Sequence, residues 1–123
     1  MMYEIRVDRA NELIEVTLGE MMSLDEVSNY ITELKRQITF YELSSYALII
    51  DVTHCPVQAQ DMIRSMGQHM ATMPKARALA VVTESALARM QVRRLFTQPY
   101  ARITAAIPEG RAWVLHGIEP ATR

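Results

Sequence analysis

The spacing of apolar residues changes several times along the chain, and each change predicts a new structural element. Residues 3–8 and 13–18 alternate apolar and charged side chains, which is typical of a β-hairpin with one solvent-facing side. Ser23 and Glu26 have the spacing of a capping box, in which a serine hydroxyl and a glutamate carboxylate bind free amide groups at a helix start. The apolar positions after this box recur at helical intervals, at Leu24, Val27, Ile31, Leu34 and Ile38. The chain is therefore expected to begin with two antiparallel strands and an amphipathic helix.

Two short apolar runs in the middle of the chain predict buried parallel strands. Residues 46–50 and 78–82 lack alternation, as strands covered on both faces do. The segment between them is long enough for the helical crossover that parallel pairing requires, and its pattern predicts a helix over residues 59–73. The sequence thus predicts a single α/β domain with a mixed, mostly parallel sheet. Binding and chemistry in such domains gather beyond the carboxyl ends of the strands, here around residues 51–55 and 83–85.

A third helix is expected after the second of these strands, with Thr83 or Ser85 as its N-terminal cap and its end near Phe96. Its apolar side chains do not keep to one stripe, and Arg89 and Arg93 lie one helical turn apart with repelling charges. Burial of part of this helix against another subunit would explain the pattern, and so would a frayed or kinked end.

The final part of the chain predicts one more strand and one more helix. The strand is expected over residues 102–107 and the helix over residues 108–116, with Gly117 after its end. The domain then spans residues 1–118, and residues 119–123 are expected to form a loose tail.

Composition limits the class of protein. A chain of 123 residues, half of them apolar, fits one globular domain. The single cysteine, Cys55, and the lack of a basic, apolar leader predict a reducing, cytoplasmic location. No apolar run approaches the roughly 20 residues that a membrane-spanning helix needs, so an integral membrane protein is not expected.

The net charge of −1 hides an uneven distribution of charged residues. Residues 1–61 carry eleven acidic side chains against four basic ones, whereas residues 62–123 carry nine basic side chains against three acidic ones. If the two halves occupied different faces, the molecule would be dipolar and suited to an acidic partner or to a second copy of itself. The alternative is that folding mixes the charges. The few basic residues and the slightly acidic isoelectric point argue against a nucleic-acid partner.

Three segments of the chain resemble one known family. Residues 46–53, Tyr-Ala-Leu-Ile-Ile-Asp-Val-Thr, look like the family's central strand, and residues 77–82 followed by residues 85–88 look like its next strand and helix. Residues 108–115, Pro-Glu-Gly-Arg-Ala-Trp-Val-Leu, look like its closing helix. Together with the order of predicted elements, these segments resemble the STAS domain, and in particular the small bacterial proteins described as SpoIIAA-like. The resemblance implies a single STAS-like domain, with helices packed on the sheet and a non-enzymatic role in regulation or protein interaction.

The sequence departs from this family at one place. Anti-sigma-factor antagonists of the STAS type carry a phosphate-accepting serine at the start of the helix that follows the central strand. The matching region here, residues 57–62, reads Val-Gln-Ala-Gln-Asp-Met and contains no hydroxyl. Control by phosphorylation at that position is therefore not expected. The SpoIIAA-like group is also similar to the CRAL-TRIO fold of lipid carriers, which implies an apolar ligand as an alternative.

Candidate catalytic and metal-binding residues are few. Thr53, His54 and Cys55 form the only cluster that combines a nucleophile with a base, but neighbours in an extended chain point in opposite directions. Asp51 ends a strand and is expected to cap the turn that follows. The histidines lack metal-binding spacings and the glycines form no phosphate loop, so no metal, cofactor or nucleotide is expected.

Three functions are compatible with these observations. The first is a cytoplasmic, non-enzymatic STAS-like domain that binds a protein partner or forms a homodimer. Its candidate surface comprises Asp51, Thr53, His54, Cys55, Ser85, Arg89, Arg93 and Arg94. The second is a carrier of an apolar or anionic, lipid-like ligand, although the methionines that define its pocket can equally pack as plain core. That candidate pocket comprises Met62, Met66, Met70 and Met90. The third is a thiol enzyme with Cys55 as nucleophile and His54 or His116 as base.

Overall fold

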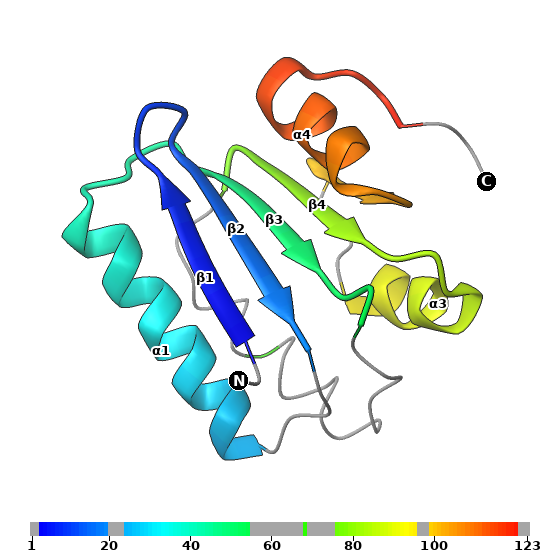
Figure 1. The fold of residues 1–123 in the computed structure, drawn as a ribbon, viewed down its shortest axis with the longest axis horizontal. Coiled ribbons are helices and arrows are strands. Elements are labelled where there is room, and N and C mark those ends of the chain that lie inside the picture. The colour runs from blue at the N-terminus through cyan, green and yellow to red at the C-terminus, as the bar shows by residue number, and fades with distance from the viewer. Residues whose placement is uncertain (1–2, 20–23, 55–67, 69–75, 96–98, 121–123) are drawn as a thin grey trace.

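The protein folds around one five-stranded sheet, whose strands lie in the order in which they occur in the chain (Figure 1). The computed structural model describes residues 3–19, 24–54, 68, 76–95 and 99–120. The strands are β1 (Tyr3–Asp8), β2 (Leu13–Leu18), β3 (Ala47–Asp51), β4 (Ala78–Val82) and β5 (Ala101–Thr104). β1 and β2 pair antiparallel, and each later strand pairs parallel with the one before it. The predicted mixed, mostly parallel sheet with an N-terminal hairpin is confirmed.

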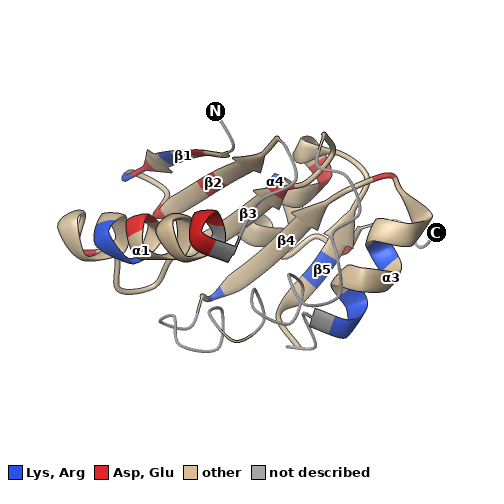
Figure 2. Cartoon of the chain, turned by 90° about the horizontal axis from the view of Figure 1, so that it is seen from below, with Lys and Arg blue, Asp and Glu red and all other residues tan. Residues whose placement is uncertain are grey.

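Helices cover both faces of this sheet. α1 (Leu24–Phe40) lies against one face and α4 (Ile107–His116) against the other (Figures 1 and 2). α3 (Ala86–Leu95) lies beside the carboxyl end of β4 (Figure 1). Ser23 lies outside the described residues, and so does the predicted helix over residues 59–73 except Gln68, which is helical.

The larger part of the core lies between α1 and the sheet. α1 buries Ile31, Leu34 and Ile38 in this core, as the helical spacing predicts. Tyr30 is also fully buried, although it was not part of the predicted stripe. Its ring meets that of Tyr3 on β1 edge-on, with 5.7 Å between the ring centroids. Burial raises the pKa of the Tyr30 hydroxyl.

A second, smaller core lies between the sheet and α4. Its buried members are Leu13, Ala47, Ile49, Ala80, Val82 and Val114. α4 approaches β4 and β5 closely at Gly110, where an added Cβ would lie 3.4 Å from the Cβ of Ala80 and 3.5 Å from the hydroxyl of Thr104. α4 packs on β3, β4 and β5, so the charged side chains of β1 on the same face stay in solvent. Glu15 of β2 is only 14% exposed on this face, because Arg111 of α4 binds it.

The boundary between β5 and α4 differs from the prediction. The strand predicted over residues 102–107 ends at Thr104, and Ile107 is already the first residue of α4. The Thr104 hydroxyl donates a hydrogen bond to the carbonyl of Ala106 at 3.2 Å, and a bond of this kind turns the chain away from strand pairing. Pro108 then lies in the first turn of α4, where its missing amide hydrogen leaves no helical bond unmade.

α4 ends at a left-handed glycine, as the sequence predicts. Gly117 has φ 69°, and its amide donates to the carbonyl of Trp113 at 2.9 Å. The amide of Ile118 donates to the carbonyl of Ala112 at 3.1 Å. These two bonds satisfy carbonyl groups that the end of a helix leaves free.

Arg102 joins β5, α4 and the chain that follows α4. Its guanidinium carbon lies 4.2 Å from the centre of the Trp113 ring. The same guanidinium binds both carboxylate oxygens of Glu119, at 2.7 to 3.0 Å, and these hydrogen bonds lower the pKa of Glu119. Glu119 is therefore held against the domain, whereas residues 121–123 lie outside the described residues.

Candidate interaction surface

The carboxyl ends of β3 and β4 lie side by side and form one border of the candidate surface. Asp51 is in register with Val82, and the amide of Val52 donates to the carbonyl of Val82 at 3.0 Å. The Asp51 carboxylate accepts hydrogen bonds from the amide of Thr53 at 2.9 Å and from its hydroxyl at 2.5 Å. The prediction that Asp51 caps the following turn is confirmed, so this carboxylate has a structural role.

A pair of hydroxyls fixes the start of α3 at the end of β4. Thr83 is buried, and its hydroxyl accepts a hydrogen bond from the amide of Ser85 at 3.2 Å. The Ser85 hydroxyl accepts a hydrogen bond from the amide of Ala88, also at 3.2 Å. Of the two predicted caps, Ser85 is therefore the N-cap of α3, and it sets the direction in which the helix leaves the sheet.

Replacing Ser85 by alanine is expected to lower the free energy of unfolding by about 1 kcal/mol, because the amide of Ala88 loses its partner. Denaturant unfolding followed by circular dichroism measures this change. Ser85→Asp serves as the matched control, since an aspartate carboxylate can accept the same bond, and it should unfold close to the wild type. Equal losses for both variants would contradict the capping role.

One face of α3 is exposed and combines apolar with cationic side chains. Leu87 is 62% exposed and Met90 is 52% exposed, so two large apolar side chains of α3 lie in solvent close to its arginines. Around Met90 lies a hollow of about 660 Å³, and its lining residues are Glu84, Ala86, Arg89, Met90, Arg93 and Ala105. We call Leu87, Arg89, Met90, Arg93 and Arg94 the α3 surface.

The three arginines of the α3 surface have no charge partner among the residues that the structure describes. Each of the other described arginines has a partner for its guanidinium group: Arg6, Arg36, Arg102 and Arg111 pair with carboxylates, Arg9 lies over the Tyr41 ring, and Arg77 binds backbone carbonyls. Positive charge is concentrated on α3 as a result (Figure 2). Unpaired guanidinium groups beside exposed apolar side chains suit a partner that carries carboxylates next to apolar residues.

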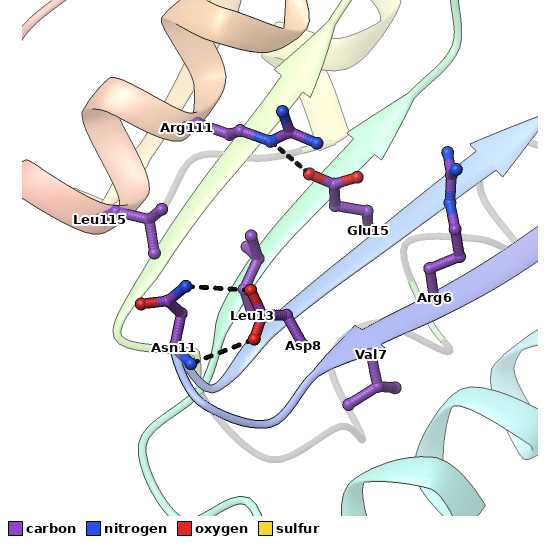
Figure 3. A pocket seen from close by; sticks show the side chains of 8 residues that line it. All are labelled: Arg6, Val7, Asp8, Asn11, Leu13, Glu15, Arg111 and Leu115. Atoms are coloured by element: carbon purple, nitrogen blue, oxygen red, sulfur yellow. Dashed lines mark hydrogen bonds and ion pairs between the residues drawn. The ribbon is translucent and has the colours of Figure 1, made fainter.

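A second, smaller pocket of about 350 Å³ lies between the hairpin and α4 (Figure 3). Its charged side chains already have partners within the domain. Arg111 binds the Glu15 carboxylate with an Nε–Oε1 distance of 2.6 Å, and Asp8 accepts a side-chain hydrogen bond from Asn11 at 2.9 Å that lowers the pKa of Asp8. Arg6 projects away from these pairs (Figure 3). With its polar groups already paired, this pocket is the weaker candidate for binding.

The structure unites only part of the predicted set of site residues. Met90, Arg89 and Arg93 line one hollow, whereas His54 is exposed in the turn after β3 and His116 is exposed at the end of α4. Four predicted residues lie outside the described part of the chain, namely Cys55, Met62, Met66 and Met70. Among the described residues, no group of three or more histidine, cysteine, aspartate or glutamate side chains could hold a metal ion.

Two lining residues of the α3 hollow, Ala86 and Ala105, were missed by the sequence reasoning. Glu84 lies within the predicted range 83–85 at the carboxyl end of β4, although it was not singled out as a site residue. Ala86 is small and carries no chemistry of its own. Ala105 comes from the turn after β5, and only the parallel pairing of β4 and β5 brings it to α3.

The fold is shared with a solved structure. Models of known protein families give no match to this chain, and curated protein sequences give none either. Among solved structures, the chain is similar to the crystal structure of an anti-sigma factor antagonist from Mycobacterium paratuberculosis, with a TM-score of 0.65 and 11% sequence identity. The match covers 91% of this chain and 93% of the other. This chain has a STAS-like fold.

The STAS-like fold confirms the resemblance that the strand and helix segments suggested. At this level of sequence identity, the likeness establishes the fold, whereas function has to be argued from the surface. Within the described residues, no helix is both long enough and apolar enough to cross a membrane.

Proposed function

We propose that this chain is a cytoplasmic, non-enzymatic STAS-like domain that forms a homodimer and regulates a protein partner by binding it through the α3 surface. The similar solved structure is described as an anti-sigma factor antagonist, and the proposal extends a regulatory binding role to this chain. The partner expected on chemical grounds presents a segment rich in carboxylates and apolar side chains.

The observation that carries this proposal is the set of unpaired arginines on α3. Guanidinium groups bind carboxylates through two parallel hydrogen bonds, and arginine is enriched at the centres of protein interfaces. Leu87 and Met90 add apolar area beside these charges, and methionine adapts its shape to a partner. The Ser85 cap holds the helix that presents them, so the surface is preformed before a partner binds.

Regulation of this binding is proposed to differ from that of serine-phosphorylated antagonists. The sequence has no serine or threonine between Thr53 and Ser65, so the start of the predicted second helix offers no hydroxyl for phosphate. We therefore expect binding to depend on the amount of each protein, or on a signal that acts on the partner.

Reversing the charge of Arg89 and Arg93 together is expected to weaken partner binding at least tenfold, or about 1.4 kcal/mol, because attraction to carboxylates becomes repulsion. Affinity capture from a cell extract, quantified by mass spectrometry, compares the Arg89→Glu, Arg93→Glu variant with the wild type. A protein bound by the wild type and depleted by the variant would then be measured directly by titration calorimetry.

The control variant is Lys35→Glu with Arg36→Glu, which changes the net charge equally but lies on α1. It should capture the partner like the wild type. Equal loss in both variants would assign the effect to overall charge, and no loss in either would refute a role for the α3 surface. Unchanged melting temperatures show that the comparison concerns binding.

A second candidate function is the binding of an anionic, apolar ligand in the α3 hollow. The hollow of about 660 Å³ is within the size range of ligand sites, and Arg89, Arg93 and Met90 would meet an anionic head and an apolar tail. The other methionines assigned to this pocket lie outside the described residues. Native mass spectrometry of the purified protein tests this alternative, since a retained molecule adds mass that disappears on denaturation.

A further inference from the structure

The outer edge of β1 is the open edge of the sheet. β1 pairs with β2 on one side, and within the described residues no backbone pairs with its other side. In Figure 2, α1 lies on one side of the sheet, beneath β1 and β2. The opposite edge of the sheet differs, because the carbonyls of Pro99 and Ala101 at β5 accept hydrogen bonds from Arg102 at 2.7 and 2.9 Å. An unpaired edge strand is a template for another strand.

The two faces of β1 carry different chemistry. Tyr3, Ile5 and Val7 are half-buried and pack against the core on the α1 side. Glu4, Arg6 and Asp8 are exposed on the other side. Glu4 and Arg6 are 55% and 64% exposed, and the distance between the Glu4 Oε1 and Arg6 Nε atoms is 3.5 Å. Both groups therefore have room to accept a further partner of opposite charge.

The order of charges on β1 complements itself in one antiparallel register. When β1 of a second copy is placed beside it with Ile5 opposite Ile5, each side chain stays on its own face of the extended sheet. Glu4 then lies opposite Arg6 of the second copy, and the two-fold symmetry repeats the pair. On the other face, Tyr3 lies opposite Val7, which extends the apolar layer over α1.

The neighbouring registers are less favourable. With Arg6 at the centre, two guanidinium groups face each other, and Glu4 faces Asp8. With Val7 at the centre, the turn after Asp8 restricts pairing to residues 6–8, whereas the register centred on Ile5 pairs residues 3–7. Charge on an edge strand usually prevents association. Here the same charges exclude the register centred on Arg6, and the length of β1 disfavours the one centred on Val7.

We propose that β1 is the dimerisation edge of this protein, where a second copy of the chain adds its own β1 antiparallel in the register centred on Ile5. This inference deepens the homodimer of the proposed function and rests on that part of it alone. The contact leaves α3 free at the other end of the sheet, so one dimer presents two α3 surfaces (Figure 1).

The test is a charge swap across the dimer edge, measured by sedimentation velocity over a range of protein concentrations. Glu4→Arg or Arg6→Glu alone places like charges opposite each other and is expected to raise the dimer dissociation constant about tenfold. The double variant E4R with R6E restores two opposite-sign pairs and is expected to return the dissociation constant close to that of the wild type. Thr39→Arg, which adds a positive charge on α1, should leave dimerisation unchanged.

A wild-type protein that stays monomeric would overturn the proposal, and so would single variants that dimerise as the wild type does. A double variant as weak as the single ones would overturn the register. Circular dichroism of each variant checks that the fold is kept, which is expected because both side chains are mostly exposed. Partner capture through the α3 surface is scored in a separate assay, so failure of the dimer edge and failure of the proposed function are distinguishable.

Discussion

Replacing Leu34 by alanine is expected to lower the free energy of unfolding by about 3 kcal/mol, the largest stability change predicted here. Leu34 is fully buried on α1, in the core that joins this helix to β2 and β3. Alanine removes apolar contacts and leaves a cavity, and the two losses add because neighbouring elements of the sheet cannot move in to fill the space. Denaturant unfolding measures the difference in unfolding free energy. The dependence of this free energy on denaturant concentration, the m-value, should be the same for the variant and the wild type.

Thr32→Ala is the matched control, because Thr32 is exposed on the same helix. It removes a similar branch without opening a cavity, and it should change the free energy of unfolding by less than about 0.5 kcal/mol. A comparable loss for both variants would contradict the role of core packing at Leu34, because alanine is the best helix former and helix propensity lowers stability at neither position.

Replacing Gly110 by valine is expected to lower the free energy of unfolding by about 2 kcal/mol, because α4 rests on β4 and β5 at this position. A Cβ built on Gly110 lies 3.4 to 3.5 Å from Ala80, Thr104 and Val82. At these distances the added Cβ makes ordinary van der Waals contacts and fills the space between α4 and the sheet. The two methyl groups of valine extend beyond it and would push α4 away from the sheet.

Gly110→Ala is expected to change the stability in the opposite direction at the same position. Its single methyl group fits, and alanine in a helix loses less backbone freedom on folding than glycine, so stability should rise by about 0.5 kcal/mol. Unfolding of both variants in denaturant separates the two effects. If alanine were as harmful as valine, the helix would sit closer to the sheet than the structure shows.

Most of the framework followed from local patterns in the sequence. The alternation in the hairpin, the unbroken apolar runs of β3 and β4, and the Gly117 stop are short-range signals, and each depends on neighbours within a few residues. The end of β5 was predicted too late because apolar Ile107 continues the strand pattern, whereas the Thr104 hydroxyl turns the chain before it.

Only part of the α3 surface could be predicted from the sequence. Its arginines and Met90 stood out on a helix with an untidy pattern, and the structure shows Leu87 and Met90 exposed. What the sequence could not show is which arginines lack partners, since that depends on long-range pairs such as Arg102 with Glu119 and Arg111 with Glu15. The open edge of β1 was equally hidden, because strand order is a property of the whole sheet.

The position of α4 at the end of the chain has a consequence for synthesis on the ribosome. The strands follow one another in the sheet, so α1 can pack on β1, β2 and β3 as soon as these strands have emerged. The opposite face, including Ile49, Ala80 and Val82, is sealed only when Val114 arrives with the last helix. Until Val114 emerges, the apolar residues of this face stay exposed on the nascent chain. We expect chaperones to bind the chain at this exposed apolar surface.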